Sequence, residues 1–195
     1  MNGFEKRKAK KETDILQASI SLFMKYGIKK VSIAEIAKEA NVSQVTIYNY
    51  FGNKDQLVEH ALTYYINQIW EEYNEIINSD LPYKEKIKHI ILKKSLTGQK
   101  IHEGLYEKVM TDFTNDRGAL KGYQEKAMPM IMNLFNEGKE KGYIDPAISN
   151  EAIIIYCQMF ITYMQREADH INMLKHAEGL TKLFFYGIFG EEKYD

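Results

Sequence analysis

Apolar residues recur every three or four positions along most of this chain, which predicts helices rather than strands. The clearest stretch is residues 31–54, VSIAEIAKEANVSQVTIYNYFGNK, whose pattern predicts two short helices joined by a tight turn. Ser32 and Glu35 have the spacing of a capping box, so the first helix is expected to begin just after Ser32. The predicted buried face of this helix contains Ile33, Ile36, Ala37 and Ala40.

Small polar residues define the turn and the ends of the second short helix. Asn41 stands at the turn, and asparagine tolerates a positive φ better than most residues other than glycine. Ser43 is a second N-cap, and Gly52 can end the helix in a left-handed conformation. Asn53, with Gln56 three residues later, can cap a third helix. Two short helices joined in this way form a helix-turn-helix motif.

The outward face of the second short helix suggests a binding surface. Val42, Ile47 and Phe51 are expected to face inward. The other side chains are donors, acceptors and small apolar groups without an acidic residue, which suits the major groove of DNA. The alternative is an ordinary solvated helix face. The predicted DNA-facing residues are Ser43, Gln44, Val45, Thr46, Tyr48, Asn49 and Tyr50, with Gln44 and Thr46 as the base contacts.

The remaining chain continues the helical pattern. Pro82 suits the first turn of one helix, while Pro129 falls inside another and is expected to kink it or start a new one. Asn115–Gly118 is expected to be a loop. Ser149 or Asn150 can cap the helix expected over residues 150–166. The expected helices cover residues 11–26, 54–78, 82–96, 105–113, 119–141, 150–166 and 173–189.

Charge is distributed unevenly along the chain. The formal net charge of −1 divides into +5 for residues 1–54 and −6 for residues 55–195. A basic N-terminal segment joined to a larger acidic one is typical of a DNA-binding domain attached to a domain that stays off DNA.

Two features each have two interpretations. Residues 1–11 carry five basic side chains, and form either a disordered, solubilising tail or an arm that meets phosphates. Cys157 lies in an apolar run, and is either a small core residue or a redox group. A single cysteine excludes an internal disulfide and fits a reducing compartment.

The sequence shows no pattern that indicates catalysis. It lacks a phosphate-cradling glycine loop, a nucleophile elbow and an HExxH motif. Glu167 and His170 form one Glu-x-x-His pair, whereas a di-iron bundle needs two. We therefore predict no catalytic residue, no metal, no cofactor and no enzymatic activity. The longest nearly apolar stretch, residues 152–164, is shorter than the ~18 residues of a membrane span, and no secretory signal is evident, so a cytoplasmic location without membrane association is expected.

Two segments are apolar around nearly their whole circumference. They are residues 152–164, AIIIYCQMFITYM, and residues 183–189, LFFYGIF. Such helices must be covered on more than one side, and the two-fold mates of a second subunit are the simplest cover. The alternative is that both helices lie wholly inside one subunit. The candidate interface residues are Met159, Tyr163, Leu180, Phe184 and Ile188.

The stretch from residue 31 to residue 54 resembles the DNA-binding domain of TetR-type transcriptional regulators. The matching pieces are the helix IAEIAKEA, the turn NVS, the aromatic signature TIYNYF and Lys54 at the start of the next helix. The resemblance is specific over about residues 15–62. Asn41 replaces the glycine frequent at the turn, and Val45 stands where a glycine often lets the helix approach the DNA backbone closely.

This resemblance implies an all-α fold with about nine helices. A three-helix helix-turn-helix domain, residues 1–54, would precede a larger effector-binding and dimerisation domain, residues 55–195. It also implies a one-component regulator, usually a repressor, that binds a pseudo-palindromic double-stranded DNA operator as a homodimer. A small effector would release the DNA. Ser32 and Lys54 match positions at helix N-termini that meet phosphates.

Aromatic residues on the helix over 54–78 suggest where an effector could bind. They could line a pocket for a small hydrophobic or amphiphilic molecule, or they could be ordinary core. Two other functions remain open: a regulator whose C-terminal domain senses a protein partner or nothing, and a helical enzyme or carrier with a vestigial helix-turn-helix. The candidate pocket residues are Tyr65, Ile69, Trp70, Tyr73, Phe113, Phe135 and Phe160.

Overall fold

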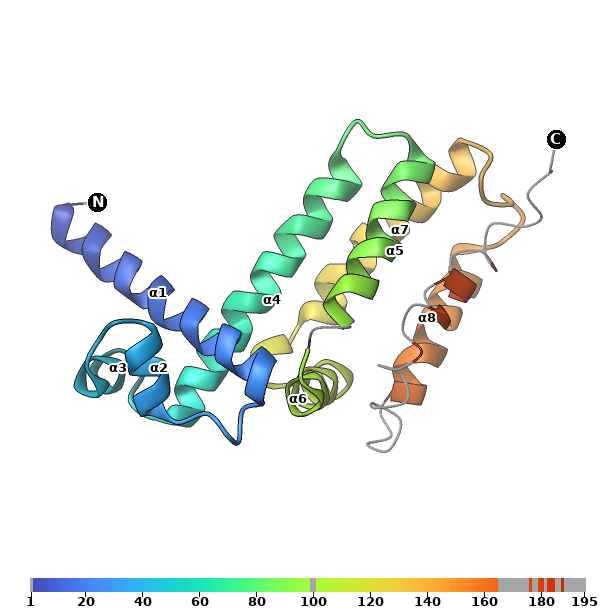
Figure 1. Cartoon of the computed structure of the whole chain (residues 1–195). Helices are drawn as coiled ribbons and strands as arrows, with labels where there is room; N and C mark the ends of the chain where they lie inside the picture. The colour runs from blue at the N-terminus through green and yellow to red at the C-terminus, as the bar shows by residue number, and fades with distance from the viewer. Residues whose placement is uncertain are drawn as a thin grey trace.

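The fold is known from a computed structural model that describes residues 2–98 and 101–164, together with 176, 179, 180, 182–184 and 187 (Figure 1). Within these residues every regular element is helical, which confirms the predicted all-α class. The elements are α1 (Gly3–Tyr26), α2 (Ile33–Glu39), α3 (Gln44–Phe51), α4 (Lys54–Asn78), α5 (Tyr83–Gly98), α6 (Glu103–Thr114), the 3₁₀ helix η1 (Gly118–Leu120), α7 (Tyr123–Glu140) and α8 (Asn150–Met164).

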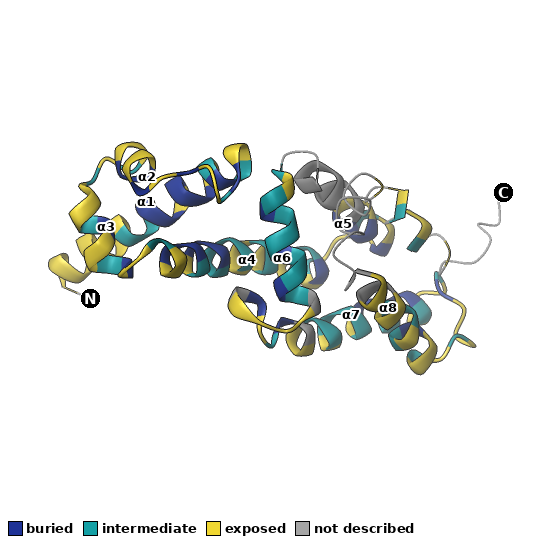
Figure 2. Ribbon diagram, turned by 90° about the horizontal axis from the view of Figure 1, so that it is seen from below, coloured by how far each residue is buried: buried dark blue, intermediate teal, exposed yellow. Residues whose placement is uncertain are grey.

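The N-terminal helices pack around a first core. α2 and α3 lie against α1 and the start of α4, and their apolar faces meet there, as the dark inward faces in Figure 2 show. Leu105 of α6 and Leu120 of η1 belong to the same core, so it extends beyond the first three helices. The largest side chains that it buries almost completely are Ile15, Phe23, Ile36, Ile47, Leu57, Leu62 and Leu105.

The predicted helix ends of this region are confirmed. Ser32 and Glu35 form the capping box of α2, Ser43 caps α3, and the Asn53 side chain accepts a hydrogen bond from the Gln56 backbone. Gly52 follows α3 with a φ of 76°. These caps satisfy backbone N–H groups that each helix start leaves without an intrahelical partner.

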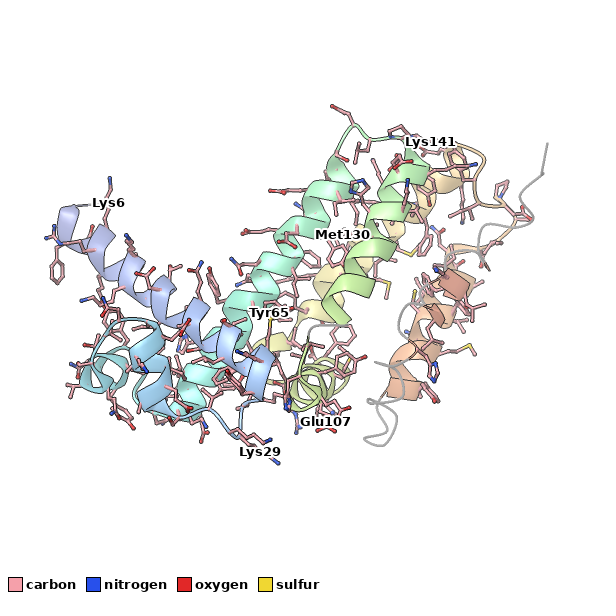
Figure 3. The ribbon with its side chains drawn as sticks, viewed as in Figure 1. Lys6, Lys29, Tyr65, Glu107, Met130 and Lys141 are labelled. Carbon is pink, nitrogen blue, oxygen red and sulfur yellow. The ribbon has the colours of Figure 1, made fainter. Side chains whose placement is uncertain are left out.

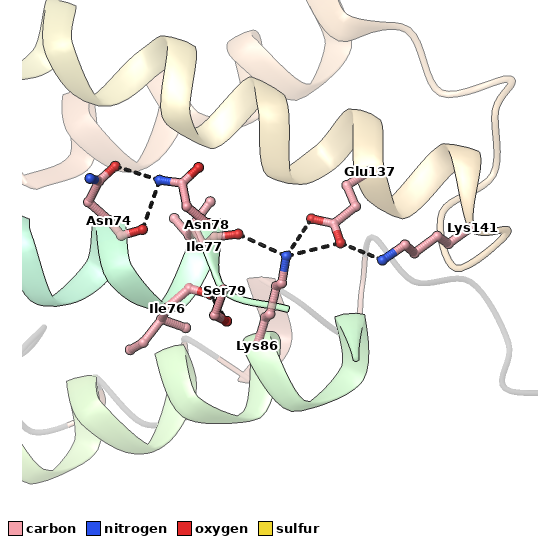
Figure 4. Close-up of polar contacts among 8 residues, drawn as sticks. All are labelled: Asn74, Ile76, Ile77, Asn78, Ser79, Lys86, Glu137 and Lys141. Atoms are coloured by element: carbon pink, nitrogen blue, oxygen red, sulfur yellow. Dashed lines mark hydrogen bonds and ion pairs between the residues drawn. The ribbon is translucent and has the colours of Figure 1, made fainter. Parts of the chain in front are cut away.

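α4 runs from the first core to a second core made by α5, α7 and α8 (Figure 1). Its C-terminal end is held by Lys86 of α5, whose Nζ donates to the Ile77 carbonyl at 2.8 Å and lies 3.1 Å from both carboxylate oxygens of Glu137 on α7 (Figure 4). Lys141 lies 2.6 Å from the same carboxylate. Lys86 is only 5% exposed, and these partners compensate for the cost of burying its charge.

The structure differs from the sequence-based expectations mainly at two places. α1 begins at Gly3 rather than near residue 11, because Asn2 and Glu5 form a capping box there. Residues 118–120 form η1, so α7 begins at Tyr123 rather than at residue 119. Pro129 lies inside α7, as expected, and of the two alternatives for it, starting a new helix is excluded. The helix expected over 173–189 is described only at seven residues, all of them helical.

No helix in the described part of the chain is long and apolar enough to cross a membrane.

Candidate DNA-binding surface

Helix α3 is fixed by its two ends and by its buried side. The Ser43 Oγ accepts a hydrogen bond from the Thr46 backbone N–H at 3.0 Å, and the two hydroxyls lie 2.9 Å apart. Ile47 and Phe51 are 1% and 3% exposed and anchor the helix in the first core. The expectation that these two residues face inward is confirmed, and Val42 packs half-buried against the same core. This anchoring sets which face of α3 points to solvent.

The solvent face of α3 combines polar groups with large apolar ones. Gln44 and Asn49 are exposed, while Thr46 and Tyr50 are half-buried. Val45 and Tyr48 are 66% and 48% exposed, high values for apolar side chains without a partner. α3 carries no acidic residue. Such a face can donate to and accept from base edges and can meet a thymine methyl group, without repelling phosphate.

The turn that orients α3 has the predicted backbone conformation. Asn41 has a φ of 52°, one of two positive values at non-glycine residues in the described part of the chain. The Val42 N–H donates to the Ala37 carbonyl at 2.9 Å, so the chain reverses immediately after α2. Asparagine can adopt this left-handed conformation at modest cost, which explains how the turn forms without glycine.

The starts of α2 and α4 flank α3. Ser32 donates to Glu35 through both its backbone N–H and its hydroxyl, each at 2.7 Å. These hydrogen bonds lower the pKa of Glu35 below its ordinary value. The Lys54 side chain turns back from the start of α4, and its Nζ donates to the Ile28 carbonyl at 2.9 Å. Both helix starts present backbone N–H groups, which favour anions such as phosphates.

Comparison with known proteins identifies the domain that contains this surface. Residues 15–61 match the tetR family of bacterial regulatory proteins. The N-terminal part of the chain is thus similar to proteins of this family. The matched residues cover the C-terminal half of α1, all of α2 and α3 and the start of α4, which are the elements that hold the candidate surface.

Two curated relatives and one solved structure are similar to the chain over different lengths. The chain is 32% identical over 89 residues to the transcriptional regulator YhgD of Bacillus subtilis, so this match spans about half of each protein, 46% of both. It is 26% identical to the regulator YvdT of the same species over 188 residues, covering 83% of this chain and 96% of YvdT. Its fold is similar to that of FadR from Bacillus subtilis, solved with stearoyl-CoA, at a TM-score of 0.56 and 19% identity, covering 90% of this chain and 98% of FadR.

The candidate effector residues are divided between the two cores. Tyr65, Trp70 and Phe113 pack on the first core, whereas Tyr73 and Phe135 belong to the second. Ile69 is half-buried on α4 between them, and the Phe160 side chain lies outside the described residues. The structure thus brings the α4 residues onto one helix that serves both cores, but it does not gather all seven side chains at one place.

Tyr65 and Tyr73 are neutral at physiological pH. Burial, with a smaller contribution from Glu72, raises the pKa of Tyr65 and of Tyr73 to about 12. Trp70 meets the ring of Tyr123 edge-on at 6.2 Å. The α4 segment therefore carries half-buried aromatic side chains, with Glu72 nearby, which suits an apolar ligand with a polar group.

An ion cluster that the sequence analysis missed joins α4 to α6. Lys108 Nζ lies 2.6 Å from Asp112 Oδ2 and 2.8 Å from Glu59 Oε1. Burial alone would lower the pKa of Lys108, but the hydrogen bonds to Asp112 and Glu59 outweigh it and raise the pKa. Asp112 is 1% exposed. Lys108 and Asp112 have helical i, i+4 spacing, but nothing in the sequence relates either residue to Glu59, 49 positions before Lys108.

The candidate interface residues fall into different environments. Met159 and Tyr163 of α8 are 61% and 46% exposed, and Ile155, which the sequence analysis did not single out, is 58% exposed on the same side of the helix. Phe184 instead packs inside the subunit, with its ring 5.3 Å from Tyr156 and 6.1 Å from Phe135. Leu180 is half-buried, and Ile188 lies outside the described residues. The spacing of 155 and 159, one helical turn, is the signal that could have found Ile155.

Proposed function

We propose that this chain is a DNA-binding transcriptional regulator that reads an operator through helix α3. The observation that carries the proposal is the exposed face of α3, where Gln44, Val45, Tyr48 and Asn49 project from a helix anchored by buried Ile47. In helix-turn-helix proteins the second helix enters the major groove, and its amide side chains can bond base edges. Ser32 and Lys54, at the flanking helix starts, lie where phosphate contacts would fix the register.

The proposed regulator acts as a homodimer on a pseudo-palindromic site. Ile155, Met159 and Tyr163 form an apolar stripe along α8, 46–61% exposed in the single chain. A two-fold mate of the same stripe would cover it. Two α3 helices held at a fixed distance then match two half-sites about one DNA turn apart. Each subunit alone would bind far more weakly.

The proposed effector is a small hydrophobic or amphiphilic molecule that lowers affinity for the operator. The half-buried aromatic side chains of α4 support this ligand class, and the acyl chain of the stearoyl-CoA bound by Bacillus subtilis FadR belongs to it. Repression, relieved by the effector, is the mode that we propose. We propose no catalytic residue and a cytoplasmic site of action.

Selection of duplexes from a random pool, followed by binding titrations, tests the proposal. The purified protein should enrich a sequence with two related half-sites. Gln44→Ala should relax the preference at one base position in each half-site by about 1–3 kcal/mol, because a bidentate amide contact discriminates by that amount. Asn74→Ala is the matched control: Asn74 is an exposed amide residue on α4 near the second core. Absence of salt-dependent duplex binding by the parent protein would exclude this function.

A further inference from the structure

Helix α1 extends well beyond the core that it helps to form. Its first fully buried residue is Ile15, whereas residues 3–11 are exposed throughout. We call Gly3–Lys11 the basic arm. Nine helical residues measure roughly 14 Å, and although the arm touches α3 at Lys8, it stays exposed along its whole length (Figure 1). Burial does not explain this length.

The basic arm carries a dense and available positive charge. It contains Lys6, Arg7, Lys8, Lys10 and Lys11 against a single acidic residue, Glu5. Glu5 is engaged at the helix start, where its carboxylate accepts from the Asn2 N–H at 2.9 Å. In the part of the chain that the structure describes, no ion pair includes a side chain of the arm. The five cations are therefore free to meet an external anion.

The arm is continuous with the candidate DNA-binding surface. The Tyr50 hydroxyl at the end of α3 donates to the Lys8 carbonyl at 3.4 Å, which joins the two helices directly. Lys8 and Lys11 precede Ile15 by seven and four positions, so all three residues lie on the same side of α1. That side faces the other helices of the domain. Lys6 points away from α2 and α3 in Figure 3, and Lys10, one turn later, shares its side.

We propose that the basic arm is a second DNA-contacting element, in which Lys8 and Lys11 bind phosphates beside the site read by α3. This inference rests on the proposed function. A stretch of 14 Å equals the rise of about four phosphates of one strand along the duplex axis. Charge complementarity and the direct contact with α3 favour duplex DNA as the partner. The arm supplies affinity and register rather than sequence preference, because phosphates carry no base identity.

The test uses pairs of substitutions within the arm and requires no knowledge of the operator. Full-length parent, Lys8→Gln/Lys11→Gln and Lys6→Gln/Lys10→Gln proteins are titrated onto a fluorescent 40-base-pair duplex of arbitrary sequence at several salt concentrations. Glutamine has nearly the helix propensity of lysine, so the arm should keep its structure, which far-ultraviolet circular dichroism checks. The two variants lose the same charge from the same nine residues, so each controls for the other.

We expect the Lys8→Gln/Lys11→Gln protein to lose about two units per protomer from the slope of log affinity against log salt, because each phosphate contact contributes about 0.9. The Lys6→Gln/Lys10→Gln protein should lose less than one. Equal losses in the two proteins would overturn the proposal, since they would indicate a general field rather than contacts on one side. An unchanged slope in the Lys8→Gln/Lys11→Gln protein, with the parent still binding, would overturn it as well.

Two further outcomes separate this inference from its alternatives. If the parent protein itself shows no salt-dependent duplex binding, the proposed function fails and the arm proposal fails with it. Vesicles of phosphatidylglycerol and phosphatidylcholine provide the second comparison. If the Lys8→Gln/Lys11→Gln change abolishes binding to these vesicles but leaves the duplex slope intact, the arm binds an anionic lipid surface and the proposal is wrong.

Discussion

The ammonium group of Lys54 donates a hydrogen bond to the backbone carbonyl of Ile28, 2.9 Å away. This contact ties the first residue of α4 to the segment between α1 and α2. Lys54 therefore holds the helix-turn-helix elements together in the free protein, in addition to placing positive charge near the candidate DNA-binding surface. A hydrogen bond that involves a charged donor contributes more to stability than one between neutral groups.

We predict that Lys54→Met weakens both the fold and DNA binding. Loss of the bond to Ile28 should reduce the free energy of unfolding by about 1–2 kcal/mol, since the carbonyl loses a charged partner. Loss of the positive charge should reduce the salt slope of duplex binding by about one unit. Urea unfolding and anisotropy titrations measure the two effects. Lys54→Arg, which keeps the charge, should preserve the slope. If Lys54→Met also preserves the slope, Lys54 makes no phosphate contact and only holds α4 to Ile28.

Contacts between distant segments mark the limit of prediction from the sequence. The caps made by Ser32, Ser43 and Asn53 were predictable because each joins residues three positions apart. The bond from Lys54 to Ile28 spans 26 positions, and nothing in either residue's neighbourhood indicates the other. From the sequence, a lysine at a helix start predicts a phosphate contact as readily as a hydrogen bond within the protein. Only the arrangement of the helices shows that Lys54 also bonds to Ile28.

The φ of 52° at Asn41 gives a prediction about the turn. Asn41→Gly should leave the stability of the N-terminal domain nearly unchanged, because glycine adopts this conformation freely. Asn41→Val should reduce it by about 1–2 kcal/mol or more, because a β-branched residue is strained at positive φ. Thermal unfolding of the two variants measures the difference. Equal melting temperatures would contradict the left-handed conformation of this residue.

The capping box of α2 predicts an acid dependence of stability. Hydrogen bonds from Ser32 lower the pKa of Glu35 in the folded state, so folding favours the ionised carboxylate. The contribution of Glu35 is thus fully present above its ordinary pKa, near 4.5, and is lost as the pH falls through the lower folded-state pKa. Urea unfolding of the parent and of Glu35→Gln from pH 7 to pH 3 tests this sign. The stability difference should shrink on acidification; a constant difference would contradict the linkage.

The candidate interface shows a different limit of sequence reading. The run from residue 152 to residue 164 is apolar on nearly every side, so the pattern predicts that α8 packs against other helices on two sides. The pattern does not show which side faces the core and which faces a second subunit. The structure resolves this within one subunit: Ile153 is buried in the second core, and Met159 is exposed. Phe184 was grouped with Met159 because both are apolar, yet it packs against Tyr156 inside the subunit.

We therefore predict opposite outcomes for two aspartate substitutions. Met159→Asp should give a folded monomer that binds a two-half-site duplex much more weakly, because the charge would lie unpaired in the proposed interface. Phe184→Asp should instead destabilise the subunit itself, because that ring packs on the second core. Gln158→Asp is the control, since Gln158 is an exposed polar residue next to the stripe. Sedimentation and unfolding measure both properties, and a monomeric parent at micromolar concentration would rule out the proposed dimer.

The last prediction concerns coupling along α4. This helix of 25 residues spans roughly 38 Å, from Lys54 beside the candidate DNA-binding surface to Ile77 in the second core. Trp70, the only tryptophan of the chain, lies on this helix against Tyr123. A ligand that displaces the aromatic side of α4 should therefore change Trp70 emission and also move the helix start that flanks α3. In a dimer this motion changes the separation of the two α3 helices, which a fixed operator cannot follow.

We expect a hydrophobic or amphiphilic compound identified by its effect on Trp70 fluorescence to lower affinity for the selected duplex. The duplex should lower affinity for the compound by the same factor, because coupling between two binding sites is reciprocal. A coupling of about 1–3 kcal/mol corresponds to a 5- to 150-fold change. Trp70→Phe serves as the control: it should remove the optical signal while duplex binding remains. A compound shown by calorimetry to saturate the protein without changing its affinity for the duplex would disprove the coupling, because α4 would then transmit nothing between its two ends.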